Sequence, residues 1–171
     1  MASESIQIRL ATRDDADTIV EFNRAMALET ENRRLDLPTL RQGIRAILES
    51  PGYGSYIVAE LPEDKSRKPV GQLMMTYEWS DWRNGVFWWI QSVYVAPERR
   101  GRGVFRAMYE HILAKAKTDP KVCGIRLYAE QNNHEAQTVY QRVGLVPAGY
   151  VVYEQDFVLC KRIDWAHKAD R

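Results

Sequence analysis

The chain has 171 residues, enough for one domain and too few for two ordinary ones. Hydrophobic residues make up 45% of it and charged residues 27%, a balance typical of globular proteins and unlike that of disordered or fibrous chains. Its net charge of +1, from 24 Lys and Arg against 23 Asp and Glu, argues against a generally basic nucleic-acid-binding protein, so any bound anion needs a local patch.

The first part of the chain predicts a strand and two helices. Apolar residues alternate with polar ones over 6–10, which predicts a half-buried strand. Thr12 and Asp15 resemble a capping box that starts a first helix. A second helix is expected from about Asp36, since an apolar stripe at helical spacing follows and the Pro-Gly pair at 51–52 ends it.

Strands and helices then alternate along the rest of the chain. Three strands are expected at 56–59, 70–79 and 86–95, and the Asn-Gly pair at 84–85 predicts a hairpin between the last two. The later elements are a helix, a strand, a helix and a final strand, expected at 104–116, 125–129, 134–143 and 150–160. A polar tail over 161–171 completes the chain. The order β-α-α-β-β-β-α-β-α-β predicts a mixed α/β (α+β) fold around one sheet with an antiparallel first half.

The turn after the strand at 86–95 carries the most informative chemistry. It reads Glu-Arg-Arg-Gly-Arg-Gly over 98–103. Glycine lets a backbone adopt positive φ and come close to a ligand, and the helix N-terminus that follows offers free N–H groups and partial positive charge. With three arginines, the turn is suited to cradle a pyrophosphate. A solvated basic turn and an RG-type nucleic-acid contact are the two alternatives.

Two motifs resemble those of the GNAT superfamily of acetyltransferases. The run Val-Tyr-Val-Ala-Pro-Glu-Arg-Arg-Gly-Arg-Gly-Val over 93–104 is similar to the acetyl-CoA-binding motif of that superfamily. Downstream, Asn-His-Glu-Ala at 133–136, Tyr140 and Gly-Leu at 144–145 resemble its second motif of Asn-x-x-Ala, a helical Tyr and Gly-Phe. The order of elements agrees too, so the resemblance covers nearly the whole chain. It implies one N-acetyltransferase domain over 1–171, with a mixed central sheet splayed between the fourth and fifth strands.

The resemblance also implies where acetyl-CoA binds as cosubstrate. The pantetheine arm would pair with the backbone at 93–95 like an added strand, the turn 99–104 would hold the pyrophosphate, and Asn133 would contact the pantetheine or phosphate arm. The implied cofactor-binding residues are Val93, Tyr94, Val95, Arg99, Arg100, Gly101, Arg102, Gly103, Val104 and Asn133.

Tyr140 is the catalytic residue that the resemblance implies, at the thioester sulfur. It lies on the apolar face of its helix, where it could instead be a core aromatic. A buried hydroxyl needs a partner, however, and a positioned phenol can hand its proton to a departing thiolate. Ordinary pKa values of ~10 for Tyr and ~8.5 for a thiol make this transfer uphill by about 2 kcal/mol, which is small against an acyl-transfer barrier.

The chain departs from the superfamily at Gln91, where many members carry a Glu that deprotonates the amine. Gln91 cannot accept a proton at neutral pH, although it can orient a water. Either another base acts or the amine arrives neutral. Glu29 and Glu31, between the first two helices, are candidate bases, as are Glu130 and Glu154, and Glu29 is the first to test.

These features predict an N-acetyltransferase that moves acetyl directly to a primary amine. The acceptor stays open between a polyamine, an antibiotic, an amino acid and a protein N-terminus. The alternative is a non-catalytic acyl-CoA-binding or regulatory module, which the missing carboxylate at 91 favours. Trp88 and Trp89 point to opposite faces of their strand, so one packs in the core and the other is left for an acceptor pocket or a dimer surface.

The cysteines, the histidines and the apolar runs indicate which cofactors, location and partners to expect. Cys123 and Cys160 lie far from any CxxC spacing, and the three histidines form no ligand cluster, so neither a disulfide framework nor a metal site is expected. No apolar run reaches the ~18 residues of a membrane span, and the start lacks a signal-peptide apolar region. We expect a cytoplasmic protein without nucleic-acid or membrane partners, and an exposed last strand would permit a homodimer.

Overall fold

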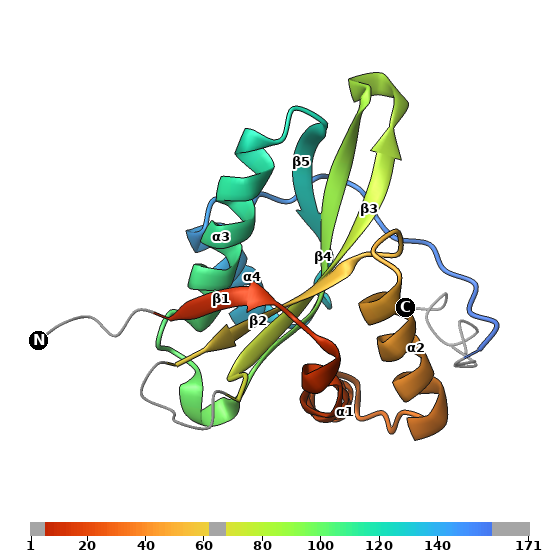
Figure 1. Cartoon of the computed structure of the whole chain (residues 1–171). Coiled ribbons are helices and arrows are strands. Elements are labelled where there is room, and N and C mark those ends of the chain that lie inside the picture. The colour runs from red at the N-terminus through yellow and green to blue at the C-terminus, as the bar shows by residue number, and fades with distance from the viewer. Residues whose placement is uncertain (1–5, 62–67, 159–171) are drawn as a thin grey trace, which may run out of the picture.

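A five-stranded sheet runs through the computed structural model, which describes residues 6–61 and 68–158 (Figure 1). Its strands are β1 (Gln7–Leu10), β2 (Ser55–Glu60), β3 (Gly71–Ser80), β4 (Gly85–Val95) and β5 (Val122–Leu127). They lie in the order β1-β2-β3-β4-β5; the first four pair antiparallel, and β5 pairs parallel with β4. This is the predicted mixed sheet with an antiparallel first half. The predicted tail at 161–171 and Cys160 lie outside the described residues.

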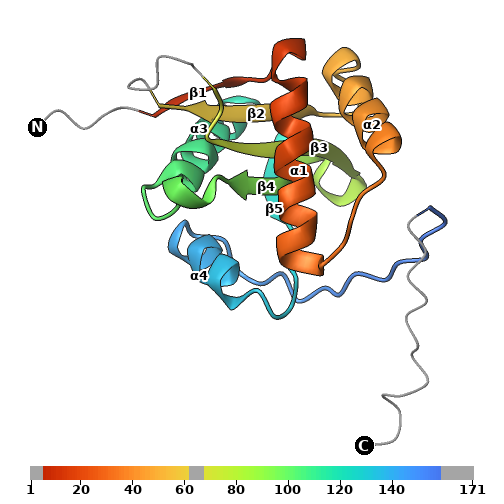
Figure 2. The ribbon, with the colours of Figure 1, turned by 90° about the horizontal axis from the view of Figure 1, so that it is seen from below.

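The helices of the described ranges cover both faces of this sheet (Figure 2). They are α1 (Ala16–Glu31), α2 (Leu37–Glu49), α3 (Val104–Thr118) and α4 (His134–Arg142). α3 and α4 lie on one face, and α1 and α2 on the other. Side chains cap the N-termini of α2 and α4. Asp36 accepts a hydrogen bond from the Thr39 N–H at 2.9 Å, and Asn133 accepts one from the Ala136 N–H at 3.0 Å. None of these helices is both long and apolar enough to cross a bilayer.

Two apolar cores lie on opposite sides of the sheet. The larger one, against α3, includes Leu73, Met108 and Ile112, all fully buried. The smaller one joins Ile19 of α1 and Ile44 of α2 to the other face. Burying each such side chain contributes about 1.5–3 kcal/mol. The buried face of α2 belongs to the apolar stripe that the sequence predicted, and the buried residues of α1 and α3 also recur at helical spacing.

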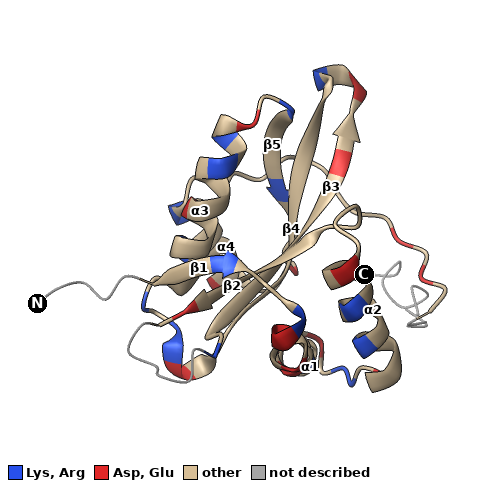
Figure 3. Ribbon diagram, viewed as in Figure 1, with Lys and Arg blue, Asp and Glu red and all other residues tan. Residues whose placement is uncertain are grey.

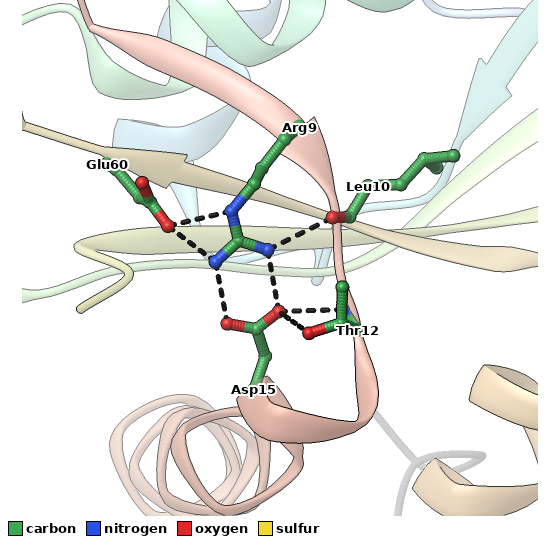
Figure 4. A network of polar contacts seen from close by, with 5 residues as sticks. All are labelled: Arg9, Leu10, Thr12, Asp15 and Glu60. Carbon is green, nitrogen blue, oxygen red and sulfur yellow. Dashed lines mark hydrogen bonds and ion pairs between the residues drawn. The ribbon is translucent and has the colours of Figure 1, made fainter. Parts of the chain in front are cut away.

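Arg9 joins β1 to the start of α1 and to β2 (Figure 4). Its guanidinium donates to the two carboxylate oxygens of Asp15 at 2.7 and 2.8 Å, and its Nε donates to Glu60 at 2.7 Å. Asp15 also accepts the Thr12 N–H at 2.7 Å, as the predicted capping pair requires. Burial raises the pKa of the Asp15 carboxyl, but the hydrogen bonds from Arg9 and Thr12 outweigh it and lower that pKa overall. The carboxylate therefore stays charged and fixes the point where α1 leaves the sheet.

β5 begins and ends earlier than the sequence predicted, at Val122–Leu127 instead of 125–129. Its first residue pairs with Val86, and Gly124 pairs with Phe87. A Cβ on Gly124 would lie 2.5 Å from the Phe87 ring, so the glycine is needed for close packing. Because glycine weakens the apolar pattern of a strand, the sequence predicts that the strand starts at 125, one residue after Gly124.

The predicted last strand at 150–160 is wrong for its described part. Residues 150–158 form no strand, and Figure 1 shows the chain after α4 running past β5 toward the side of α2. Its large apolar side chains are 67–92% exposed; they are Tyr150, Val151, Val152, Tyr153, Phe157 and Val158. Such residues favour strands chiefly by packing on neighbouring strands, so without a partner edge their propensity alone forms none.

Candidate active site

β4 and β5 separate where the family resemblance implied a splay. Their paired positions run from Val86 with Val122 to Ile90 with Leu127, whereas β4 continues to Val95. Beyond Ile90, the side of β4 that faces β5 has no strand partner among the described residues. The predicted pantetheine-binding residues 93–95 therefore lie on an unpaired edge of β4.

A β-bulge in β4 begins one residue before this stretch and includes Val93. Gln72 pairs with Tyr94 and Met74 pairs with Gln91, so two residues of β4 lie opposite one residue of β3. Ser92, one of the two, has a φ of 48°. The buried Gln72 amide donates to the Ser92 carbonyl at 3.3 Å across the bulge. Bulges redirect side chains beside active sites, but a bulge formed by a serine has no signature in a single sequence.

The turn between β4 and α3 has the backbone that its glycines predicted. Gly101 and Gly103 have φ values of 73° and 80°, in the left-handed region. A Cβ on either glycine would meet no atom within 4 Å, so the space above both is open to a ligand. Gly103 is the N-cap of α3 and no side chain caps this helix, so its first N–H groups are suited to bind an anion.

The three arginines of this turn have different environments. Arg100 donates from Nε to the Val95 carbonyl at 2.9 Å and from a terminal nitrogen to Glu29 of α1 at 2.6 Å. Arg102 is exposed and has no ion-pair partner in the described chain, whereas Arg99 is half-buried. Figure 3 shows Lys and Arg mixed with Asp and Glu on α2 and α3. With its three arginines, the turn is therefore a local basic patch of the kind that a protein with a net charge of +1 needs to bind an anion.

Tyr140 and Asn133 both belong to α4. The Tyr140 ring packs edge-to-face on Phe105, in the first turn of α3, with ring centroids 5.3 Å apart. Burial raises the pKa of Tyr140, and its hydroxyl has no hydrogen-bond partner among the described residues. Tyr140 is therefore a protonated donor near the α3 N-terminus. Asn133 caps α4 with its side-chain oxygen, which leaves its amide hydrogens for other partners.

Gln91 lies on the other face of the sheet, in a polar and aromatic group. Its Nε2 donates to Thr76 Oγ1 at 2.6 Å, and its Oε1 accepts from the Tyr128 hydroxyl at 3.3 Å. The Tyr128 ring lies 5.9 Å from that of Trp89, while Trp88 packs against the larger core. Trp89 is thus the tryptophan that faces the Gln91 side. Sequence reasoning missed Tyr128, since nothing in its spacing sets it apart.

Glu29, the first candidate base, is a poor one in this structure. Burial raises the pKa of its carboxyl, but hydrogen bonds from Arg100 and from the Tyr94 hydroxyl, at 2.6 and 2.7 Å, outweigh burial and lower that pKa overall. A carboxylate held in this way binds a proton weakly. The sequence could not show this, because Arg100 lies 71 positions from Glu29.

The other candidate bases divide into two kinds. Glu130 accepts hydrogen bonds from the backbone and side chain of Asn132, at 2.8 and 3.0 Å, so it orders the loop before α4. Burial raises the pKa of Tyr128, and the charges of Glu154 and Glu31 raise it further. The charges of these two carboxylates therefore affect Tyr128 on the Gln91 side of the sheet. Glu31 lies at the end of α1 and Glu154 in the C-terminal segment.

Comparison with known proteins matches this geometry to one family. The model of the Acetyltransferase (GNAT) family matches residues 18–145. A solved structure of a possible acetyltransferase from Clostridium difficile 630 is 41% identical, with a TM-score of 0.81 over 90% of this chain and 98% of that one. A search of curated proteins found no match.

Two more distant structures share the fold alone. One is ribosomal-protein-alanine N-acetyltransferase from Brucella melitensis biovar Abortus 2308, at 15% identity and a TM-score of 0.71 over 90% of this chain and 99% of that one. The other is glucosamine-6-phosphate N-acetyltransferase from Arabidopsis thaliana, at 18% and 0.68 over 90% and 99%. Their names specify different acceptors, so the fold does not determine the acceptor.

Proposed function

The chain belongs to the GNAT family of acetyltransferases and is an acyltransferase, and we propose that it transfers acetyl from acetyl-CoA directly to a primary amine. Members of this family generally use acetyl-CoA as cosubstrate. The observation that carries the proposal is the turn before α3. Its two left-handed glycines open onto an uncapped helix N-terminus, beside a β4 edge that β5 leaves unpaired.

Acetyl-CoA supplies an acetyl group activated as a thioester. The backbone of residues 93–95 would pair with its extended arm, and the N–H groups of the turn and of Val104 would hold the pyrophosphate with charge from Arg99 and Arg102. The amide hydrogens of Asn133, which have no acceptor among the described residues, would donate to the same arm. Open space at both glycines is what such a group needs, and we take residues 1–171 as one domain built around it.

Three groups of this chain would serve the transfer. A β4 N–H near Val93 donates to the thioester oxygen as negative charge develops there. Tyr140 gives its proton to the departing sulfur. Gln91 accepts a hydrogen bond from the amine through Oε1 and takes no proton, so the amine enters in its neutral form. The proton that the attacking nitrogen loses as the amide forms passes to solvent water, from which Tyr140 regains the proton that it gave to the sulfur. Holding both substrates together supplies much of the rate enhancement.

The proposal is tested by incubating the protein with acetyl-CoA and a panel of amines: a polyamine, an aminoglycoside, free amino acids and a short peptide. Thiol release is followed by colorimetry and the acetylated product by mass spectrometry. We expect thiol release that depends on one class of amine, with initial-rate lines that intersect, because direct transfer needs both substrates bound. Coenzyme binding by calorimetry without thiol release from any amine would contradict it.

A further inference from the structure

One carboxylate of α1 contacts the turn that we assign to the coenzyme. Glu29 accepts a hydrogen bond from the Arg100 guanidinium at 2.6 Å through one oxygen and from the Tyr94 hydroxyl at 2.7 Å through the other. These partners lie 71 and 65 positions away along the chain. Glu29 therefore joins the helix on the Gln91 face to the end of β4 and to the turn before α3.

The Arg100 side chain is engaged at three points. Besides Glu29, its Nε donates to the Val95 carbonyl at 2.9 Å, and its guanidinium lies 5.3 Å from the centroid of the Tyr94 ring. Tyr94 is 7% exposed, and its ring also lies 5.2 Å from that of Phe22 on α1. A planar guanidinium on an aromatic ring with charge-assisted bonds on two sides has little freedom to turn toward a ligand.

We propose that Glu29 is a positioning residue for the coenzyme, because it holds Arg100 against the end of β4. The turn 98–103 then keeps its backbone N–H groups directed at the pyrophosphate. This rests on the proposed function, since it assumes that the coenzyme binds at this turn. Arg100 then shapes the turn, while Arg99 and Arg102 supply the charge.

The effect on binding has a definite size and salt dependence. The side chains of Glu29 and Arg100 are 40% and 46% exposed, so water and salt screen part of their attraction. Their hydrogen bonds to the buried Tyr94 and to the β4 backbone are screened less. We expect Glu29→Gln, which keeps the shape and loses the charge, to weaken coenzyme A binding about fivefold at low salt.

The experiment compares Glu29→Gln, the charge reversals Glu29→Arg and Arg100→Glu, and the double reversal, in the full chain. Calorimetry gives the dissociation constant for coenzyme A, and initial rates give KM and kcat for acetyl-CoA. Each single reversal is expected to weaken binding about tenfold or more, and the double reversal to recover most of that loss. Glu29→Gln is expected to raise KM and to change kcat by less than about twofold.

Glu21→Gln is the matched control, because Glu21 is an exposed α1 carboxylate paired with Arg24 at 3.0 Å, and it should bind coenzyme A like the wild type. Circular dichroism and thermal unfolding confirm that each variant is folded. The inference is overturned if Glu29→Gln binds normally, if the double reversal binds as weakly as Arg100→Glu, or if Glu29→Gln lowers kcat with an unchanged KM. Failure of the proposed function looks different, since the wild type itself would then either not bind coenzyme A or bind it without releasing thiol to any amine.

Discussion

The Tyr140 hydroxyl is held in place by ring packing on Phe105 rather than by hydrogen bonds within the described chain. Removing the hydroxyl therefore leaves the ring contact and takes away only a proton donor. A substitution of this one residue can thus separate the loss of proton donation from the loss of coenzyme binding.

We expect Tyr140→Phe to lower kcat by about 100-fold or more, because general acid catalysis by a positioned side chain contributes about that much. The dissociation constant for coenzyme A should stay within about twofold of the wild type, since the ring packing remains. Stopped-time assays of thiol release and calorimetry give the two quantities. Tyr109→Phe is the control, because Tyr109 is a buried tyrosine of α3 whose ring also stacks on Phe105. Equal turnover in both variants would remove Tyr140 from the mechanism.

Gln91 gives the second residue-scale prediction, which concerns pH. Without a base at this position, kcat/KM should rise with pH toward the pKa of the acceptor amine, because only the neutral amine attacks. Gln91→Glu introduces a carboxylate with a reference pKa of ~4.3, so its kcat/KM should exceed that of the wild type at neutral pH and level off at lower pH. Rate profiles between pH 6 and 10 test this. Gln42→Glu, on an exposed position of α2, adds the same charge and should leave the profile unchanged.

At the scale of elements, the junction of β4 with α3 depends on backbone conformation more than on side chains. Gly101 and Gly103 occupy the left-handed region in open space. An alanine there has room for its Cβ but must adopt a disfavoured conformation, at a cost of about 1–2 kcal/mol. The element therefore either keeps its shape under strain or relaxes away from it.

We expect Gly103→Ala to weaken coenzyme A binding about tenfold, because relaxation of the N-cap turns the first N–H groups of α3 away from the pyrophosphate. Calorimetry at constant salt measures the change. Gly149→Ala is a matched control: Gly149 has a φ of 74° and equally open space, but lies in the C-terminal segment. The same loss of affinity in both variants would mean that strain in general, and not this turn, controls binding.

The elements also show how far the sequence alone could go. The apolar stripe of α2 and the capping pair of Thr12 and Asp15 were predictable, since helical periodicity and capping both act over a few positions. The turn at 98–103 was predictable because its glycines carry the backbone signal themselves. The bulge at Ser92, the Tyr128–Gln91 bond and the Glu29–Arg100 pair were not, since they depend on contacts between residues 20, 37 and 71 positions apart. The prediction of a strand at 150–158 was wrong for the same reason: a strand forms by pairing with another strand, and the sequence of one segment does not show whether a partner strand is available.

At the scale of the whole molecule, the sheet separates two chemically different faces. Tyr140 and the α3 N-terminus lie on one face, and Gln91, Trp89 and Tyr128 on the other. The two faces open toward each other where β4 leaves β5, so both depend on β4 being held in a fixed position by the rest of the sheet. Contacts at the opposite edge, around Arg9, therefore support the site through stability rather than chemistry.

Asp15 gives the prediction for that stability. The Asp15 pKa is lowered in the folded protein, so its contribution is present above the unfolded pKa of ~3.9 and is lost as pH falls through the lower folded value. Asp15→Asn should lower the free energy of unfolding by about 2–3 kcal/mol at pH 7, because Arg9 loses a charged partner that is 5% exposed. Urea titrations at pH 7 and at acid pH measure the difference between the two proteins, which should shrink as pH falls below 4. Asp17→Asn, whose carboxylate is exposed and pairs with Arg41, should cost less than about 1 kcal/mol. A gap between wild type and Asp15→Asn that persists in acid would mean that shape, and not charge, explains the role of Asp15.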